Sequence, residues 1–180
     1  NPRLPRKLEE LVARQPRIIA TRFHAHRGKE QYLDSFAESG VRALWEKGVE
    51  LGLIVELHIG PNYASQVAEV LRDIPETTAL IDHLAEPHMG SGVEFAEVLE
   101  LASFERVYMK LSGLNHFAKD VPFYESARSF TKRVIEAFGV ERMVWGSGSP
   151  GIVDAHMKGY TEEEREKVRG GNLDGLLDWA

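Results

Sequence analysis

The feature that most constrains the fold is a regular alternation of two kinds of segment. Short apolar runs rich in β-branched residues are separated by longer stretches whose apolar residues recur at helical spacing. Such alternation predicts a parallel sheet with helices packed outside it. The expected strands lie near 18–24, 53–59, 78–83, 106–112 and 142–147, and the expected helices near 4–13, 32–52, 64–72, 93–102, 126–138 and 161–179. Thr161 with Glu164 forms a capping-box pattern at the start of the last helix.

Two parallel architectures fit this alternation. A doubly wound open sheet can be built from five strands, whereas a (β/α)₈ barrel needs eight strands and typically about 250 residues. The chain has 180 residues, so the strand count favours the open sheet. The polar residues at the strand ends favour the barrel.

Composition excludes several classes of function. The net charge is −6 and no run of Lys or Arg occurs, so nucleic acid and anionic membranes are not expected partners. No apolar run approaches the roughly 20 residues that span a bilayer, and no leader pattern is visible. With no cysteine there is neither a disulfide nor a thiolate zinc site. We expect one domain over residues 1–180, a cytoplasmic location and a small-molecule substrate, and homo-oligomerisation stays open.

Polar side chains gather near the C-terminal ends of the first four expected strands. Side chains alternate between the faces of a strand, so those expected to share a face can be read from the spacing. Because parallel strands place their sites at their C-terminal ends, these residues predict one shared polar site. The expected members are Arg22, His24 and His26 in the first strand, His58 in the second, His83 in the third, with Asp82 on the opposite face, and Lys110 and Ser112 in the fourth.

The pair His24 and His26 has two readings. Histidines at alternate strand positions can hold zinc, because both imidazoles project from one face. Beside Arg22, the same pair suits a substrate carboxylate, since a guanidinium binds carboxylates with two hydrogen bonds. His88, His116 and His156 are expected in solvated loops, with His156 close enough to a strand end to reach a site.

Several segments together resemble the amidohydrolase-2 family of the metal-dependent hydrolase superfamily, which includes 2-pyrone-dicarboxylate lactonase-like hydrolases and aminocarboxymuconate-type decarboxylases. The segments are LIVELHIGP, TALIDHLAEP, RVYMKLSGL, FGVERMVWGSGSP and KVRGGNLDGLL. The resemblance runs from about Ile18 to the C-terminus and implies a (β/α)₈ barrel. It matches His83 to the family's IDH histidine, His58 to the histidine of the preceding strand, and Lys110 and Ser112 to the KLSG strand.

Two departures from the family pattern bear on the metal. Gly148 stands where the family's GSD motif has an aspartate, and Asp154, six residues on, is the available replacement. By its order in the chain, the strand holding His24 and His26 resembles the third barrel strand. We therefore expect the first two strands, with the family's metal-binding HxH pair, to be missing, and the chain to be an incomplete barrel that begins downstream of its gene start. Accordingly we expect no tight metal in this chain, while a divalent metal such as zinc stays open for the full-length protein.

The resemblance implies a hydrolase or a related decarboxylase acting on a small carboxylated lactone or amide. His83 and His58 are the expected catalytic residues, polarising a carbonyl or orienting water, and neutral histidine suits proton transfer near pH 7. The expected substrate-binding residues are Arg22, His24, His26, Lys110 and Ser112. The alternative is a non-catalytic family member that binds a small molecule or a partner after loss of the aspartate.

Overall fold

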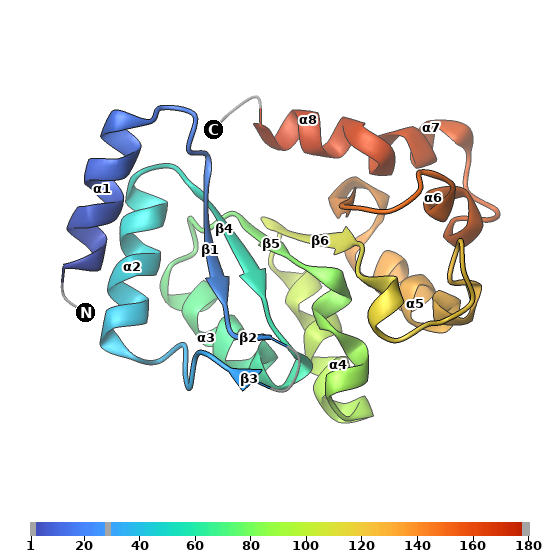
Figure 1. Ribbon diagram of the computed structural model, residues 1–180, viewed down its shortest axis with the longest axis horizontal. Helices are drawn as coiled ribbons and strands as arrows, with labels where there is room; N and C mark the ends of the chain where they lie inside the picture. The colour runs from blue at the N-terminus through green and yellow to red at the C-terminus, as the bar shows by residue number, and fades with distance from the viewer. Residues whose placement is uncertain (1–2, 28–29, 178–180) are drawn as a thin grey trace.

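The computed structural model describes residues 3–27 and 30–177. In this part of the chain, five strands form one parallel sheet whose neighbours follow in chain order (Figure 1). A doubly wound sheet has a point at which the strand order reverses, and these five strands have no such point. The predicted strand positions and order are therefore confirmed, and the fold is an incomplete (β/α)₈ barrel. The strands are β1 (Ala20–His24), β4 (Ile54–His58), β5 (Ala79–Ile81), β6 (Val107–Leu111) and β7 (Met143–Trp145).

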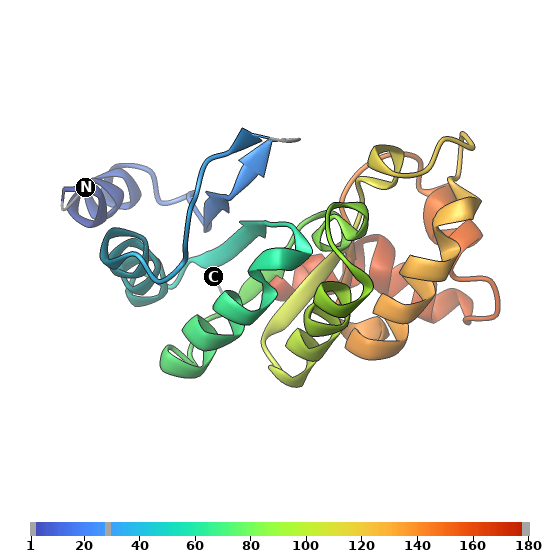
Figure 2. The same ribbon diagram turned by 90° about the horizontal axis from the view of Figure 1, so that it is seen from below.

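Helices cover the outer face of the sheet. Figure 2 shows α3, α4 and α5 side by side on one side of the strands. Between helices and sheet, Leu57, Ile81 and Met109 are fully buried. Trp45 of α2 stacks on Phe23 at 5.4 Å between ring centroids. The helices are α1 (Leu4–Arg14), α2 (Ser39–Glu50), α3 (Ala64–Asp73), α4 (Gly92–Glu100), α5 (Arg128–Phe138), α6 (Gly151–His156), α7 (Glu162–Glu166) and α8 (Asn172–Leu177). Across the described ranges, none of the helices has the length and apolar character needed to cross a membrane.

The inner face of the sheet changes character along the strands. Near their starts it is apolar: Ile54, Leu80 and Val144 pack with Leu173 and Leu176 of α8. This helix lies at the end of the sheet where β1 begins (Figure 1). Toward the C-terminal ends the same face carries charged and imidazole side chains. The apolar contacts close one end of the inner face, which leaves the polar end as the place for chemistry.

Two predicted helices differ from the structure. The helix expected over 32–52 begins only at Ser39. The preceding segment is held instead by distant partners, because the Tyr32 N–H donates to the Ala25 carbonyl and the Phe36 N–H donates to Gln66 Oε1. A short antiparallel hairpin, β2 (His26–Arg27) with β3 (Glu30–Gln31), also precedes it.

The helix expected over 161–179 is divided by a π-helical turn over residues 167–171. Trp179, its expected end, lies outside the described residues. The capping box of Thr161 and Glu164 at its start is confirmed.

His156 belongs to the core of the molecule. It ends α6 and is buried, which corrects the expectation of a solvated loop. Its Nε2–H donates to the Phe123 carbonyl at 2.7 Å, and its Nδ1 lies 2.9 Å from the Thr131 hydroxyl. Both ring nitrogens are therefore satisfied by the fold, and neither faces the strand-end site.

We expect His156 to make the stability of the protein fall in mild acid. Burial is the main cause that lowers its pKa below the ordinary value of 6.5. As the pH falls below 6.5, His156 therefore binds a proton in the unfolded chain before it does so in the folded protein. The free energy of unfolding falls as the pH drops toward the folded pKa of His156. One such group contributes a slope of at most about 1.4 kcal/mol per pH unit. Urea unfolding of the wild type and His156→Gln between pH 5 and 7 measures it, and equal slopes in the two proteins would contradict it.

Candidate active site

One cavity lies at the C-terminal ends of the inner strands. Its volume is about 510 Å³, within the usual range for small-molecule sites. Six of the lining residues are histidines, and one is a buried glutamate that the sequence analysis did not select. The lining residues are His24, His26, His58, His83, Glu86, His88, Met89 and His116.

The turn after β5 places His83 and Glu86. The strand ends at Ile81, and four successive residues from His83 to Glu86 have positive φ angles between 49° and 57°. This conformation is uncommon for residues other than glycine and marks a local cost that the surrounding structure holds in place. It lets His83 leave the strand pattern and reach the cavity, where its Nδ1 lies 2.8 Å from Ser112 Oγ.

The approach of His83 to the next strand depends on Gly113. A Cβ atom on this residue would lie 2.6 Å from the Cβ of His83, and its φ of +66° is also unfavourable for other residues. The KLSG segment therefore accommodates His83 through both a serine hydroxyl and a glycine.

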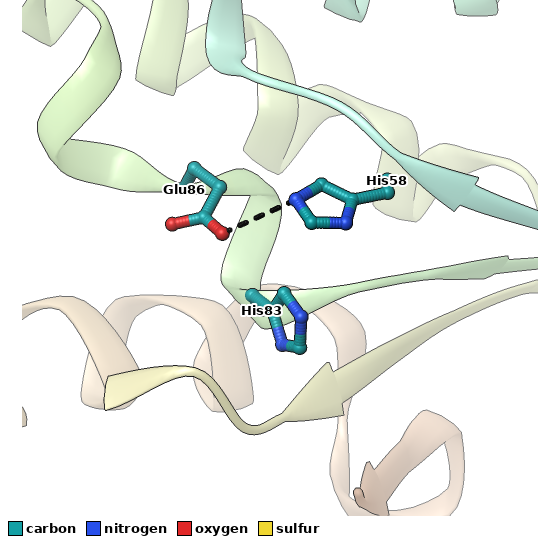
Figure 3. Close-up of side chains that lie close together, drawn as sticks. All are labelled: His58, His83 and Glu86. Atoms are coloured by element: carbon teal, nitrogen blue, oxygen red, sulfur yellow. Dashed lines mark ion pairs between the residues drawn. The ribbon is translucent and has the colours of Figure 1, made fainter. Parts of the chain in front are cut away.

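Glu86 is the centre of the imidazole cluster. Its Oε1 lies 2.7 Å from His116 Nδ1 and 3.5 Å from His58 Nε2, and its Oε2 lies 3.6 Å from His88 Nδ1. Figure 3 shows the carboxylate directed at the His58 ring, with His83 beneath. Burial acts to raise the pKa of Glu86, but the hydrogen bond from His58 and the charge of His116 outweigh it and lower the pKa. The buried carboxylate is therefore ionised at neutral pH.

Two groups in the cavity have unused hydrogen-bonding capacity. His26 is 4% exposed, and neither of its ring nitrogens has a hydrogen-bond partner in the described structure; the same holds for Glu86 Oε2. Buried polar groups in native proteins are nearly always paired, so these atoms indicate the position of a polar ligand. Burial lowers the pKa values of His24, His26 and His83, which makes these imidazoles neutral near pH 7.

A group of four charges lies just below the histidines on the inner face. Arg22 donates to Asp82, and Lys110 donates to Glu56. Lys110 Nζ also lies 3.0 Å from Asp82 Oδ1, and Arg22 Nε lies 4.0 Å from Glu56 Oε2. Two cations thus face two carboxylates, and we call these four residues the charge quartet. Arg22 is linked to the histidines by a 3.1 Å contact between its Nη2 and His58 Nδ1.

The structure thus brings the predicted site residues together, in two layers. His24, His26, His58 and His83 line the cavity, with Ser112 beside His83. Arg22 and Lys110 lie in the charge quartet below. Their individual roles stay predictions. The prediction that Asp82 and His83 lie on opposite faces was wrong because of His83. Asp82 continues the alternation after Ile81 and faces Arg22 and Lys110 on the inner face. The turn after β5 brings His83 to the cavity on that same side.

Glu86 was missed because it follows the strand by too many residues for alternation to place it. The local signal is the spacing Asp82-His83-x-x-Glu86-Pro87, which puts a carboxylate three residues after a strand-end histidine. His88 and His116, expected in solvent, both contact this carboxylate, although each is partly exposed.

Three of these groups could hold a metal ion by distance. Ligand atoms of His58, His83 and Glu86 all lie within 4.8 Å of one another. Imidazole nitrogens and a carboxylate oxygen are also the donor types that zinc accepts.

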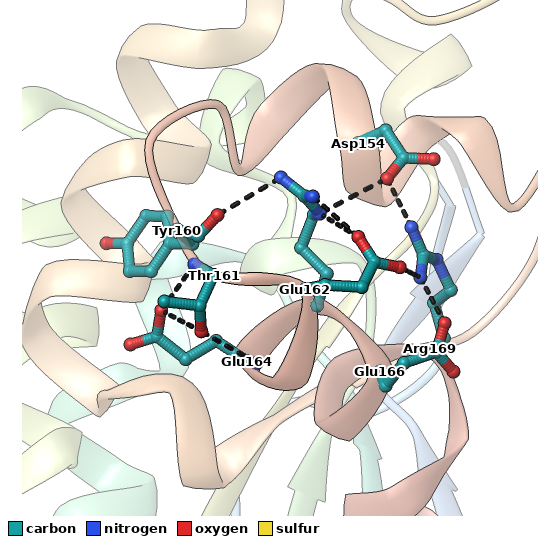
Figure 4. A network of polar contacts seen from close by, with 8 residues as sticks. Asp154, Tyr160, Thr161, Glu162, Glu164, Glu166 and Arg169 are labelled. Atoms are coloured by element: carbon teal, nitrogen blue, oxygen red, sulfur yellow. Dashed lines mark hydrogen bonds and ion pairs between the residues drawn. The ribbon is translucent and has the colours of Figure 1, made fainter.

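The late strand supplies no carboxylate to this cavity. After β7 the segment of Gly146 to Gly148 is exposed. Asp154 contacts Arg165 at 3.4 Å and is also paired with Arg169. Figure 4 shows Asp154 within the ion-pair network of α7, together with Glu162 and Glu166. Asp154 therefore serves that network and does not replace the aspartate that Gly148 lacks.

Sequential parallel strands with polar residues at their C-terminal ends define a protein of the (β/α)₈-barrel class. The amidohydrolase family model matches residues 2–172. The chain therefore belongs to the amidohydrolase family.

Known proteins support the same placement. L-fucono-1,5-lactonase of Burkholderia ambifaria is 32% identical over 95 residues, which cover 51% of this chain and 33% of that protein. The matched segment thus spans about a third of this curated relative.

Three solved structures share the fold. An amidohydrolase from Burkholderia multivorans with bound HEPES gives a TM-score of 0.80 at 16% identity, covering 97% of this chain and 70% of that one. The same amidohydrolase with bound zinc gives 0.67 at 17% identity, covering 97% and 78%. A probable 2-pyrone-4,6-dicarboxylic acid hydrolase from Acinetobacter baumannii gives 0.72 at 19% identity, covering 97% and 68%.

Proposed function

We propose that this chain carries the active site of a hydrolase for small, neutral, polyhydroxylated lactones. The observation that carries the proposal is the ionised, buried Glu86 in a cavity of imidazoles, with an unpaired oxygen facing the same space as the unpaired nitrogens of His26. Substrate hydroxyl groups would satisfy both. The relative that hydrolyses L-fucono-1,5-lactone supports the substrate class.

The charges of the site favour a neutral substrate over the carboxylated one that the sequence suggested. No Lys or Arg is among the described residues lining the cavity. Arg22 and Lys110 are neutralised by Asp82 and Glu56 in the charge quartet. A carboxylate brought into the cavity would therefore meet Glu86 without a free cation to compensate, and burying an uncompensated charge is costly. Because the substrate of a decarboxylase carries a carboxylate, the same cost favours hydrolysis over decarboxylation.

In the proposed reaction, Glu86 is the general base that activates water. A water oxygen bonds to the lactone carbonyl carbon while its proton passes to the Glu86 carboxylate. The ring C–O bond then breaks, and the proton moves from Glu86 to the leaving oxygen, which yields the open hydroxy acid. His83 is placed to polarise the carbonyl, and His58 directs its Nε2 at Glu86. General-base assistance of this kind contributes about 10²- to 10⁴-fold.

The proposal is tested by measuring acid release in weak buffer with two substrates. We expect L-fucono-1,5-lactone, a neutral polyhydroxylated lactone, to be hydrolysed with a kcat/KM at least about tenfold above that for 2-pyrone-4,6-dicarboxylate. A preference for the dicarboxylate would overturn the substrate class. Binding of the lactone without turnover, with turnover gained in Gly148→Asp, would establish the non-catalytic alternative instead.

A further inference from the structure

The contact between Arg22 and His58 determines where the proton of the imidazole lies. A guanidinium has five N–H donors and no acceptor. Nδ1 of His58, 3.1 Å from Arg22 Nη2, must therefore accept with its lone pair. The proton of the neutral ring is then on Nε2, and this nitrogen lies 3.5 Å from Glu86 Oε1.

The arginine is held in place by the charge quartet. The same Nη2 that faces His58 also donates to Asp82, whose side chain is 1% exposed. On its other side Asp82 forms an ion pair with Lys110, with 3.0 Å between Oδ1 and Nζ. The His58 ring is also stacked on His24 with 4.3 Å between centroids, which restricts its rotation. Arg22 and His58 are thus fixed relative to each other by contacts on both sides.

This arrangement conflicts with a metal at His58, His83 and Glu86. A histidine that ligates a metal through one nitrogen donates the N–H of the other to a carboxylate, a carbonyl or water. His58 has the reverse environment, because a permanent donor faces Nδ1 and the proton occupies Nε2. The distances of the group permit a metal ion, but its hydrogen bonds do not.

We propose that Arg22 is a positioning residue that holds the proton of His58 on Nε2, and thereby makes His58 a hydrogen-bond donor to Glu86 and not a metal ligand. This use of Arg22 replaces the carboxylate-binding role suggested by the sequence. This proposal rests on the proposed function in one respect: the hydrogen bond from His58 orients Glu86 as the catalytic carboxylate. The position of the proton follows from the contacts themselves.

The first test reads the tautomer of His58 directly. Long-range ¹H–¹⁵N NMR spectra of the full chain are recorded for the wild type, Arg22→Met, Arg22→Lys and the control Arg42→Met, which removes a surface partner of Asp73. We expect His58 to carry its proton on Nε2 in the wild type, Arg22→Lys and Arg42→Met, and to lose this preference in Arg22→Met. A proton on Nδ1 in the wild type, or an unchanged tautomer in folded Arg22→Met, would overturn the proposal. If Arg22→Met does not fold, the wild-type and Arg22→Lys spectra still decide.

The second test measures zinc affinity by titration with zinc alone. Removing the donor should free Nε2 for coordination, so we expect Arg22→Met to bind zinc about tenfold more tightly than the wild type, and Arg42→Met to match the wild type. Tight zinc in the wild type that is lost in His58→Ala would overturn the proposal. Neither test uses lactone turnover: an absence of hydrolysis with the expected tautomer would defeat the proposed function alone.

Discussion

Replacing Glu86 by Gln should reduce kcat/KM for the lactone by about 100-fold or more. The amide keeps the size of the side chain but cannot accept the proton of the attacking water, and general-base assistance is worth about 10²- to 10⁴-fold. Initial rates at saturating and low lactone concentrations separate the effect into kcat and KM. Because the amide still offers a polar group to the substrate, most of the loss should be in kcat.

The matched control is Glu94→Gln. Glu94 is the partly exposed glutamate of the capping box at the start of α4, where it accepts from the Ser91 N–H at 2.7 Å. Its replacement removes one carboxylate from the surface and should leave kcat/KM unchanged within about twofold. If Glu86→Gln retains more than a tenth of wild-type kcat/KM, Glu86 is not the base and the mechanism above is wrong.

The fold was largely predictable because its signals are local. Strand and helix periods, glycine stops and the capping box of Thr161 are properties of a few neighbouring residues. The prediction failed over 32–38, where an amphipathic pattern continues toward α2 but the backbone is bound to Ala25 and Gln66. Hydrogen bonds to partners so distant in the sequence do not change the hydrophobic periodicity of the segment, so the sequence pattern does not reveal them.

The location of the candidate site was predictable from the sequence, but the carboxylate at its centre, Glu86, was not. Parallel strands bring their C-terminal ends together, which was sufficient to collect His24, His58 and His83. Alternation failed at His83, since the chain there leaves the strand for a turn with positive φ angles. Of the two buried carboxylates that organise the site, Asp82 lies just before that point and Glu86 lies beyond it.

The charge quartet should also be the most sensitive point of the site for stability. We expect Asp82→Asn to lower the free energy of unfolding by about 3 kcal/mol, because removing one partner of a buried ion pair typically costs 3–5 kcal/mol. The lower figure applies here because Arg22 is 41% exposed and water screens part of its charge. Each Asp82 oxygen faces a different cation, so asparagine would satisfy one of them and turn its amide N–H₂ toward the other.

Asp73→Asn is the control, because Asp73 also pairs with an Nη2 atom, that of Arg42, but its side chain is 62% exposed. Exposed pairs contribute about 0–1 kcal/mol, so this variant should change little. Urea unfolding at pH 7, followed by tryptophan fluorescence, compares the two. Equal losses would mean that water screens Asp82 as well as it screens Asp73, and Arg22 would then lack the rigid anchor on which the position of the His58 proton depends.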